Sequence, residues 1–470
     1  MFLKRGSMNK TFSSTHEFSK HHPLVTGTIL LTGAGFLSRI IGFFYRIYLS
    51  RLFGEEGIGI YQLIHPVSAL AFSLTAAAFQ TAISKFVAAQ TGKFETKNEI
   101  KSYRPMILCA VISIPLSIVT AVVLYFGAEF IALYYLQEPR TFVLIRLLAF
   151  TVPFSAAHAC INGYFYGIKK AIVPAWTQLL EQFFRVGSVS ILATFLTKSN
   201  NIPDLKITVL GLIIGEIAGF FGALFVLIRK RTMEISQGAT YTTSSVTYKA
   251  LFSMIIPLTA NRVLLNALLS VEAVTLPSCL RTFGYDNTTA LSIYGVLTGM
   301  AFPLIFFPNA LTGSVSVMLL PVISENMALG RKSEVRKAVI KTIQYCSILG
   351  FFCMSFFLFF GRTIGEKVFH SQLAGYFIGV LSLLCPFLYM NSTLSGILQG
   401  VGRATALFIS NITSLLLRLV FIYLTVPYHG IKGYLWGLLA SQILQTILYL
   451  SILFLKNSLH ISAQSSNIIK

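Results

Sequence analysis

Long apolar runs, separated by short polar connectors, fill most of the chain. Each run is about 20 residues or longer, which is the length that a helix needs to cross the hydrocarbon core of a membrane. We expect one membrane-spanning helix for each run, and twelve in all. The runs cover residues 26–50, 58–88, 105–126, 141–167, 174–197, 208–228, 250–278, 291–323, 338–360, 373–400, 405–426 and 433–455. The pattern therefore predicts an all-α polytopic membrane protein.

The connectors predict how the chain is divided. The longest one, 229–249, begins with three consecutive basic residues and falls at the middle of the chain. We interpret it as a cytoplasmic linker between two six-helix lobes, 26–228 and 250–455, with cytoplasmic tails at 1–25 and 456–470. Connectors this short leave no room for a soluble catalytic domain.

Composition narrows the class of protein. Of the 470 residues, 55% are hydrophobic and 11% are charged, whereas soluble proteins carry about 25% charged residues. This difference excludes a secreted enzyme, a cytosolic nucleotide-binding protein and a disordered scaffold. The formal net charge is +21. In a membrane protein such an excess is typical of cytoplasmic connectors that face anionic lipid, so we expect membrane lipids as partners and no nucleic acid.

The placement of Lys and Arg predicts the orientation of the chain. Most basic residues outside the runs lie in the two tails and in every second connector. Because basic connectors stay on the cytoplasmic side, we expect a multi-pass protein of the cell membrane with both termini in the cytoplasm. The opposite connectors hold Arg51, Arg140, Lys198, Lys206, Arg281, Arg362, Lys367 and Lys432.

An internal repeat relates the two lobes. Several glycines and basic residues of the first lobe coincide with the same residue types of the second after a shift of about 230 residues. Six helices in each unit is an even number, so the repeats share one orientation and are related by an axis along the membrane normal. A shift of 233 places Gly163 and Gly167 on Gly396 and Gly400, Lys170 on Arg403, and Arg185 on Arg418, and a shift of 230 places Phe53 and Gly54 on Phe283 and Gly284.

The first run carries two arginines at membrane depth. Gly35, Arg39, Gly42 and Arg46 fall on one face of a helix because their spacings are 4, 3 and 4. Arginine binds phosphate in a bidentate manner, so this face predicts a cationic wall for a diphosphate. Alternatively, Arg39 pairs with an intramembrane acid and Arg46 extends to the interface. Lys85 ends the second run, where it either reaches the interface or binds a lipid headgroup.

The seventh run carries a second group of polar residues. Asn261, Arg262 and Asn266 are candidates to bind the headgroup of a substrate, because polar groups at this depth face a bundle interior or a cavity. Glu272 lies further along the same run. It is either a proton or cation coupling site or a counter-ion for Arg39.

The fifth run contains an acid and a base one helical turn apart. Glu181 and Arg185 have the i,i+4 spacing that favours an ion pair, so we interpret them as an intramembrane salt bridge. The repeat places Arg418 in the equivalent position of the second lobe, but Ser414 stands where the acid is expected. The partner of Arg418 therefore has to come from another helix.

Glu216 lies in the sixth run among glycines that permit close approach of another helix. It is a candidate partner for Arg39 or Arg146, or a coupling residue. The driving force stays open at this point, because Na⁺, H⁺ and the membrane potential all act on charges at this depth.

Breaks in the apolar pattern predict helix bends. His65-Pro66 in the second run, and Pro303 and Pro308 in the eighth, free backbone carbonyls that must find partners or line a wet cavity. The chain has no G-x-x-x-x-G-K-[ST] loop for ATP and no group of ligands at metal-binding spacing. We therefore expect a protein that is not an enzyme, with no metal and no cofactor.

Several of these segments, in this order, resemble one family. They are SRIIGFFYRIYLSRLFG, QLLEQFFRV, YGVLTGMAFPLIFFPNALTGSVSVMLLPVISE and GILQGVGRA. The chain resembles the stage V sporulation protein B group, in the polysaccharide transporter branch of the MATE-like (MOP) flippase superfamily, which includes the lipid II flippases. The resemblance covers about 25–455.

The resemblance implies a two-lobe, V-shaped bundle with a central cavity. The cavity would accept the headgroup of an undecaprenyl-linked sugar and move it outward by alternating access. Arg39 matches the position of an arginine that lines the cavity in lipid II flippases, whereas Tyr45 stands at the second such position and Arg46 follows it. The two further C-terminal spans of some lipid II flippases are not expected in this chain.

Three functions remain open on the sequence. The first is a monomeric flippase for a polyprenyl-diphosphate-linked glycan, such as a peptidoglycan precursor or another polysaccharide unit. The second is a MATE-type drug or cation antiporter, which requires an acidic and aromatic cavity. The third is a non-transporting membrane scaffold in the assembly of the cell wall or spore envelope.

Overall fold

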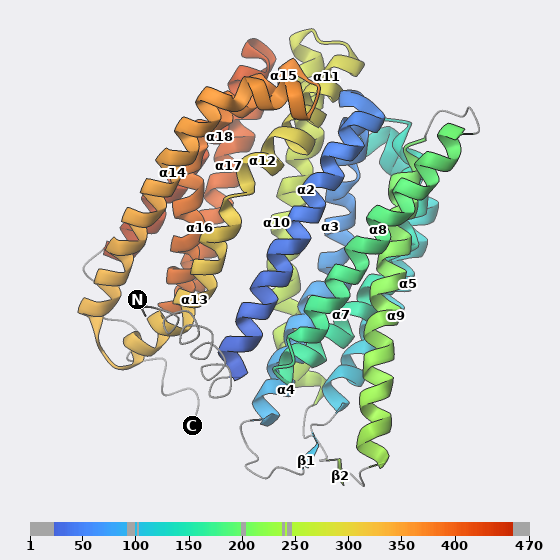
Figure 1. The fold of residues 1–470 in the computed structure, drawn as a ribbon, viewed down its shortest axis with the longest axis vertical. Helices are drawn as coiled ribbons and strands as arrows, with labels where there is room; N and C mark the ends of the chain where they lie inside the picture. The colour runs from blue at the N-terminus through green and yellow to red at the C-terminus, as the bar shows by residue number, and fades with distance from the viewer. Residues whose placement is uncertain are drawn as a thin grey trace, which may run out of the picture. The chain divides into compact units, whose positions relative to one another are not determined.

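The computed structural model describes residues 23–91, 99–100, 103–198, 204–236, 240–241 and 247–454, and nearly all of them are helical (Figure 1). The predicted all-α membrane fold is confirmed. The predicted tails lie outside the described residues, except that the first helix begins at Pro23.

In the described ranges, helices succeed one another with few other elements, and three π-helical segments and one 3-10 segment lie among them. Among the described residues, the only strands are β1 (Glu99–Ile100) and β2 (Thr240–Tyr241), which pair in parallel. The helical elements are α2 (Pro23–Leu63), α3 (His65–Phe72), η1 (Ser73–Ala77), α4 (Ala78–Thr91), α5 (Arg104–Phe130), η2 (Ile131–Tyr135), α6 (Thr141–Ala149), α7 (Thr151–Gly167), α8 (Ile172–Lys198), α9 (Lys206–Ser236), α10 (Tyr248–Phe283), α11 (Asn287–Gly295), η3 (Val296–Ala301), α12 (Phe302–Phe306), α13 (Asn309–Ala328), α14 (Lys332–Val368), α15 (Gln372–Leu381), η4 (Ser382–Leu384), α16 (Cys385–Gly400), α17 (Ala404–His429) and α18 (Ile431–Phe454).

Eleven helices in the described part of the chain are long and apolar enough to cross a membrane, and the bent pair α6 and α7 raises the number to twelve. The boundaries differ from the predicted runs in two places. The first two runs form one helical series, Gly33–Ala89, and the run 291–323 divides into Asn287–Phe306 and Asn309–Ala328. The division falls at Pro308, as the helix-breaking effect of proline predicts.

A glycine turns the chain inside α2. Gly54 has φ +68° and ψ −171°, so the helix axis breaks there although the helical assignment continues. Only glycine adopts this conformation without steric strain. The predicted bend at His65-Pro66 is also present, because α3 starts at His65 after a single turn residue.

The described residues form two compact units. The first contains the residues up to Gly42, Leu70–Ala128 and Val143–Arg262. The second contains Phe43–Ala69, Glu129–Phe142 and the residues from Val263 onward. Long helices contribute to both units, so these units are discontinuous in sequence, and the two six-helix lobes stay a prediction.

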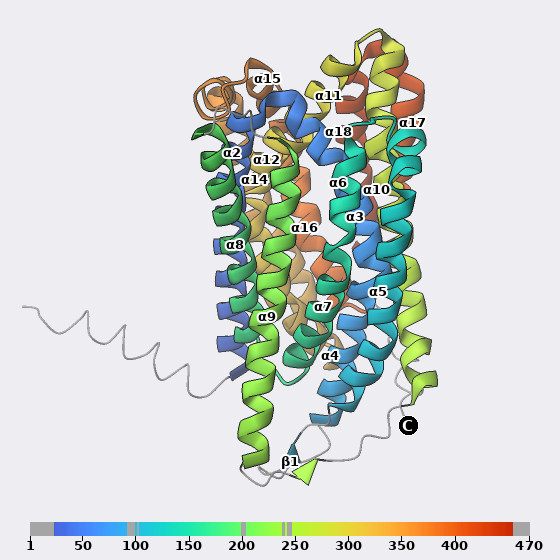
Figure 2. The same ribbon diagram turned by 90° about the vertical axis from the view of Figure 1, so that its right-hand side faces the viewer.

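The helix α9 extends beyond its predicted run. It continues through Arg229, Lys230 and Arg231 to Ser236, so the connector starts later than the basic residues indicate. In the first unit α8 and α9 lie side by side along their length (Figures 1 and 2).

The internal repeat is visible in the backbone. Residues with positive φ recur at the shifts found in the sequence, and each ends a helix or breaks one. At a shift of 233, Gln137 (φ 54°) corresponds to His370 (φ 54°) and Lys169 (φ 60°) to Gly402 (φ 85°), and at a shift of 230, Gly54 (φ 68°) corresponds to Gly284 (φ 118°).

The repeated Gly-x-x-x-Gly segments make equivalent helix contacts. A Cβ atom on Gly163 of α7 would lie 2.7 Å from the carbonyl oxygen of Gln80 in α4. A Cβ atom on Gly396 of α16 would lie 2.8 Å from the carbonyl oxygen of Ser316 in α13. Both helix pairs therefore depend on a glycine at the point of closest approach.

Each unit has an apolar core of its own. The cores form where these close helix pairs meet, and their members are almost completely buried. The core of the first unit includes Ala78, Phe79, Ile83, Val87, Cys160, Tyr164, Phe165 and Leu251. The core of the second unit includes Ile323, Val335, Val339, Cys346, Leu394, Ile397, Leu398 and Tyr449.

Candidate functional site

Arg39 lies in the first apolar run, on α2, and its side chain is exposed in the structure. Within the described part of the chain it has neither an ion pair nor a hydrogen bond. Gly35 and Gly42 flank it on the same face, and a Cβ atom on either would meet nothing within 4 Å. Small residues thus flank Arg39 on this face of α2, and the cationic wall stays a prediction. An exposed charge at this depth is unfavourable unless water or an anion solvates it.

Arg262 and Lys85 come together in the first unit. Nη2 of Arg262 on α10 donates a hydrogen bond of 3.2 Å to the Thr81 hydroxyl on α4. Lys85 follows Thr81 by one helical turn, so its side chain emerges on the same face. Both cations are exposed, as is Asn261 beside Arg262. The structure thus groups three of the predicted binding residues, and their only described partner is a hydroxyl.

Arg46 and Asn266 belong to the second unit. Arg46 is half-buried, and no acid pairs with it among the described residues. Asn266 is also half-buried, one turn before a buried stretch of α10. Both stay predicted binding residues.

The partner of Arg418 is Glu272. Nη2 of Arg418 on α17 lies 2.5 Å from Oε2 of Glu272 on α10. The hydroxyl of Tyr434, on α18, donates a hydrogen bond of 2.6 Å to the other carboxylate oxygen. Of the two hypotheses for Glu272, the structure favours a counter-ion, but for Arg418 rather than for Arg39. Tyr434 was not predicted from the sequence.

A cavity of about 270 Å³ opens beside this ion pair in the second unit. Its polar wall combines the ion pair with other polar side chains, among them Gln62, His65 and Tyr294, and apolar residues line the rest. The acid and the base neutralise each other, so the wall is polar without a net charge. The lining also includes Pro66, Leu269, Ala273, Leu276, Thr298, Phe302, Phe306, Leu384, Leu388, Tyr434, Leu438 and Gln442.

The first unit contains a cluster of four ionisable groups, of which His158 is buried and the other three are half-buried. Glu181 and Arg185 form the predicted ion pair on α8. Glu216 on α9 lies 4.0 Å from Nδ1 of His158 on α7. One oxygen of each carboxylate and a ring nitrogen of His158 all lie within 4.8 Å of one another. His158 was missed by the sequence analysis, because a single histidine in an apolar run carries no spacing signal.

His158, Glu181 and Glu216 could hold a metal ion, but Glu181 already forms an ion pair with Arg185. Two carboxylates and one guanidinium leave one excess negative charge in a region that penalises charge. A proton on Glu216 or on His158 removes that excess. The second nitrogen of His158 lies 3.1 Å from the Thr177 hydroxyl, which fixes the ring.

A second ionic cluster lies outside the spans, in the connector between η2 and α6. Nε of Arg140 lies 2.6 Å from Glu138, and Nη1 of Arg140 lies 2.7 Å from Glu56. Asn287 donates a hydrogen bond of 2.9 Å to Glu138. Burial acts to raise the pKa of the Glu138 carboxyl, but the hydrogen bonds from Arg140 and Asn287 outweigh it, so the pKa lies below its ordinary value. The cluster ties α2, α11 and this connector together.

Lys230 anchors the end of α9. Its ammonium group donates hydrogen bonds to the hydroxyls of Tyr103 and Tyr164 at 3.1 Å and 3.0 Å, and it pairs with Glu234. It also lies 5.2 Å from the centre of each tyrosine ring. Lys230 is therefore a structural contact of the first unit rather than part of an open linker.

Solved structures share this fold. An inward-facing multidrug resistance MATE family transporter of the MOP superfamily has a TM-score of 0.69 at 14% identity, covering 93% of this chain and 99% of that one. The structure of lipid II flippase MurJ in an inward closed conformation has a TM-score of 0.66 at 17% identity, covering 90% of this chain and 87% of that one. The apolar helices and this likeness thus define a multi-pass membrane protein with a MATE-like fold.

The sequence comparisons give the family. The polysaccharide biosynthesis protein family matches residues 24–327, which is more than half of the chain. The chain belongs to this family. Stage V sporulation protein B of Bacillus subtilis (strain 168) is 28% identical over 430 residues, or 90% of this chain and 82% of that protein. The family resemblance found in the sequence is therefore confirmed.

Proposed function

We propose that the protein is a flippase that moves an undecaprenyl-diphosphate-linked glycan from the cytoplasmic to the outer leaflet by alternating access. The glycan is a peptidoglycan precursor or another polysaccharide unit. In this proposal the protein is a transporter rather than an enzyme, it acts as a monomer, and both termini lie in the cytoplasm.

One observation carries the proposal. Arg39, Lys85 and Arg262 are exposed cations on helices of the membrane region, and no acid among the described residues neutralises them. Two half-buried arginines behave differently, since Arg185 and Arg418 each have a carboxylate partner. Cations without counter-ions at membrane depth require an anionic ligand or water. A diphosphate carries the matching charge, and a guanidinium binds it through two hydrogen bonds.

Glu216 is the proposed coupling residue. Among the four predicted candidates, Glu181 and Arg185 neutralise each other, and Glu272 is bound by Arg418. Glu216 lies 4.0 Å from Nδ1 of His158, a contact that becomes an ion pair only when the histidine is protonated. The cluster would gain a proton from one side of the membrane and lose it to the other. The membrane potential and Na⁺ are the competing driving forces.

The two other functions have weaker support. A cation antiporter needs a free acid at its binding site, but Arg418 already neutralises Glu272 in the cavity of the second unit. Export of a cationic dye would favour that function. A non-transporting scaffold does not need exposed cations on its membrane helices. This function therefore does not explain why Arg39 is exposed.

Reconstitution tests the proposal. The purified protein is placed in vesicles with defined undecaprenyl-diphosphate-linked sugars, and the accessibility of the sugar is followed on each face. We expect sugars to cross at least tenfold faster than in protein-free vesicles. Equal rates would contradict flippase activity. Undecaprenyl-monophosphate-linked sugar is the control for recognition of the diphosphate.

A further inference from the structure

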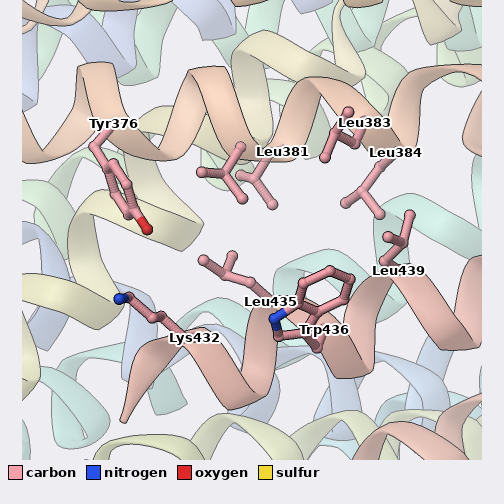
Figure 3. Close-up of a pocket in the computed structure, with 9 residues that line it drawn as sticks. Tyr376, Leu381, Leu383, Leu384, Lys432, Leu435, Trp436 and Leu439 are labelled. Carbon is pink, nitrogen blue, oxygen red and sulfur yellow. The ribbon is translucent and has the colours of Figure 1, made fainter. Parts of the chain in front are cut away.

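A groove on the second unit combines an apolar floor with a polar end. It has a volume of about 180 Å³ and lies between the segment 376–384 and the start of α18. Leu381, Leu384 and Leu435 form its floor and are buried. Figure 3 shows the Tyr376 hydroxyl and the Lys432 amine at one end of the groove, and leucines at the other.

The two ends of the groove lie at different positions along two candidate spans. Tyr376 is in the second turn of α15 and Lys432 in the first turn of α18, and both helices begin candidate spans. Leu384 and Leu439 lie about two turns further along these elements, or about 11 Å along the helix axes. The polar end thus lies where both candidate spans begin, and the apolar end lies two turns inside them.

Trp436 stands on the rim of this groove. Trp436 is 66% exposed, and Tyr376 is 47% exposed. Tyrosine and tryptophan are enriched at the headgroup level, where an amphipathic ring has one wet and one apolar side. The groove therefore matches a molecule that has an anionic head and a hydrocarbon chain. It offers one ammonium group and two amphipathic rings at the polar end, and leucines along the rest.

We propose that this groove binds an anionic membrane phospholipid, with the phosphodiester at Lys432 and Tyr376 and an acyl chain along the leucines. The charge favours this occupant over a diphosphate lipid. Among the described residues that line the groove, Lys432 is the only cation, so it neutralises one phosphodiester but not the two or more charges of a diphosphate. In the sequence, Lys432 also belongs to the connectors that carry few basic residues, which are predicted to lie on the side opposite the tails.

Fluorescence tests the proposal, because the chain has two tryptophans, and Trp176→Phe leaves Trp436 as the sole tryptophan. This protein is reconstituted in phosphatidylcholine vesicles that contain either brominated phosphatidylglycerol or brominated phosphatidylcholine at equal mole fractions. We expect brominated phosphatidylglycerol to quench Trp436 with an apparent affinity about fivefold higher, the preference that one lysine at an anionic surface provides. Equal quenching by the two lipids overturns the proposal.

Three variants in the same background separate the groove from general attraction to anionic lipid. Lys432→Ala should abolish the preference, while quenching by brominated phosphatidylcholine stays unchanged and shows that the fold is intact. Lys432→Arg should restore it. Lys367→Ala is the matched control, because Lys367 is also exposed and belongs to the same predicted set of connectors, and it should keep the preference. Loss in Lys367→Ala, or a preference that survives Lys432→Ala, contradicts the proposal.

Two competitors identify the occupant. Unlabelled phosphatidylglycerol should relieve the quenching of Trp436, and inorganic phosphate should not, because the apolar chain contributes to binding. Undecaprenyl diphosphate should relieve it less than phosphatidylglycerol at the same concentration. If undecaprenyl diphosphate relieves it more strongly, the groove holds the tail of a polyprenyl lipid, and the proposal is wrong.

Discussion

Arg418 and Glu272 form an ion pair across two helices of the second unit, with 2.5 Å between Nη2 and Oε2. Their side chains are 15% and 10% exposed, and Tyr434 completes the coordination of the carboxylate. This pair supplies the counter-ion that Arg418 lacks on its own helix. Arg39 differs from the arginines that have a carboxylate partner, because no acid among the described residues pairs with it.

Breaking this pair should destabilise the protein. In Glu272→Gln the Arg418 guanidinium stays buried without its counter-ion, which costs about 3–5 kcal/mol. The midpoint of thermal unfolding in detergent should therefore fall. The double variant Glu272→Gln with Arg418→Met should recover most of the loss, because no uncompensated charge remains. Glu366→Gln is the control, since it breaks an exposed pair with Arg362 and should change stability by less than about 1 kcal/mol. A single variant as stable as the control would refute this role.

Gly215 should be intolerant of any side chain. A Cβ atom there would lie 2.8 Å from the carbonyl oxygen of Glu181, between α8 and α9. Gly215→Ala should therefore destabilise the first unit by about 1–3 kcal/mol through overpacking. Gly187→Ala, on α8 where a Cβ atom meets nothing within 4 Å, should stabilise it by about 0.5–1 kcal/mol. Unfolding midpoints of the two variants measure the contrast, and equal midpoints would count against the close helix contact.

A pH gradient should drive transport through Glu216. An inwardly or outwardly directed proton gradient across vesicles should change the flipping rate of the wild-type protein, since the excess charge of the cluster favours binding of one proton. Glu216→Gln should make the rate insensitive to the gradient, without loss of folded protein. His158→Gln should alter the pH at which the rate is half-maximal. A wild-type rate that ignores the gradient but follows the membrane potential would assign coupling to another charge.

Stability in acid should depend on Glu138. Its pKa lies below the ordinary value because the hydrogen bonds from Arg140 and Asn287 outweigh burial, so the folded state binds fewer protons than the unfolded state. The contribution is present above the ordinary pKa of about 4.3 and is lost as the pH falls through the lower folded value. Each unit of lowering contributes about 1.4 kcal/mol. Unfolding midpoints between pH 7 and pH 3 should converge for wild type and Glu138→Gln as the pH falls. A constant difference would refute the linkage.

Local patterns in the sequence predicted the features that depend on neighbouring residues. The apolar runs predicted the helices, and the i,i+4 spacing predicted the ion pair between Glu181 and Arg185. The glycines of the repeat mark close helix contacts, because a small residue recurring every four positions lies on one face.

Contacts between distant segments could not be predicted in this way. Glu272 and Arg418 belong to different helices, and periodicity within one helix does not say which helix packs against it. The same holds for His158 and Glu216, which come from α7 and α9. The two boundary errors have a local cause, since Gly54 bends a series that remains helical and Pro308 divides one apolar run into two helices.

The affinity of the purified protein for undecaprenyl diphosphate, compared with uncharged undecaprenol, tests the central claim most directly. We expect the diphosphate to bind at least tenfold more tightly, and Arg39→Gln or Arg262→Gln to remove most of that preference. Arg362→Gln, an exposed arginine with a carboxylate partner, should leave it unchanged. Equal affinity for the two lipids, or a preference that survives loss of both Arg39 and Arg262, would contradict the role of these cations in binding an anionic cargo.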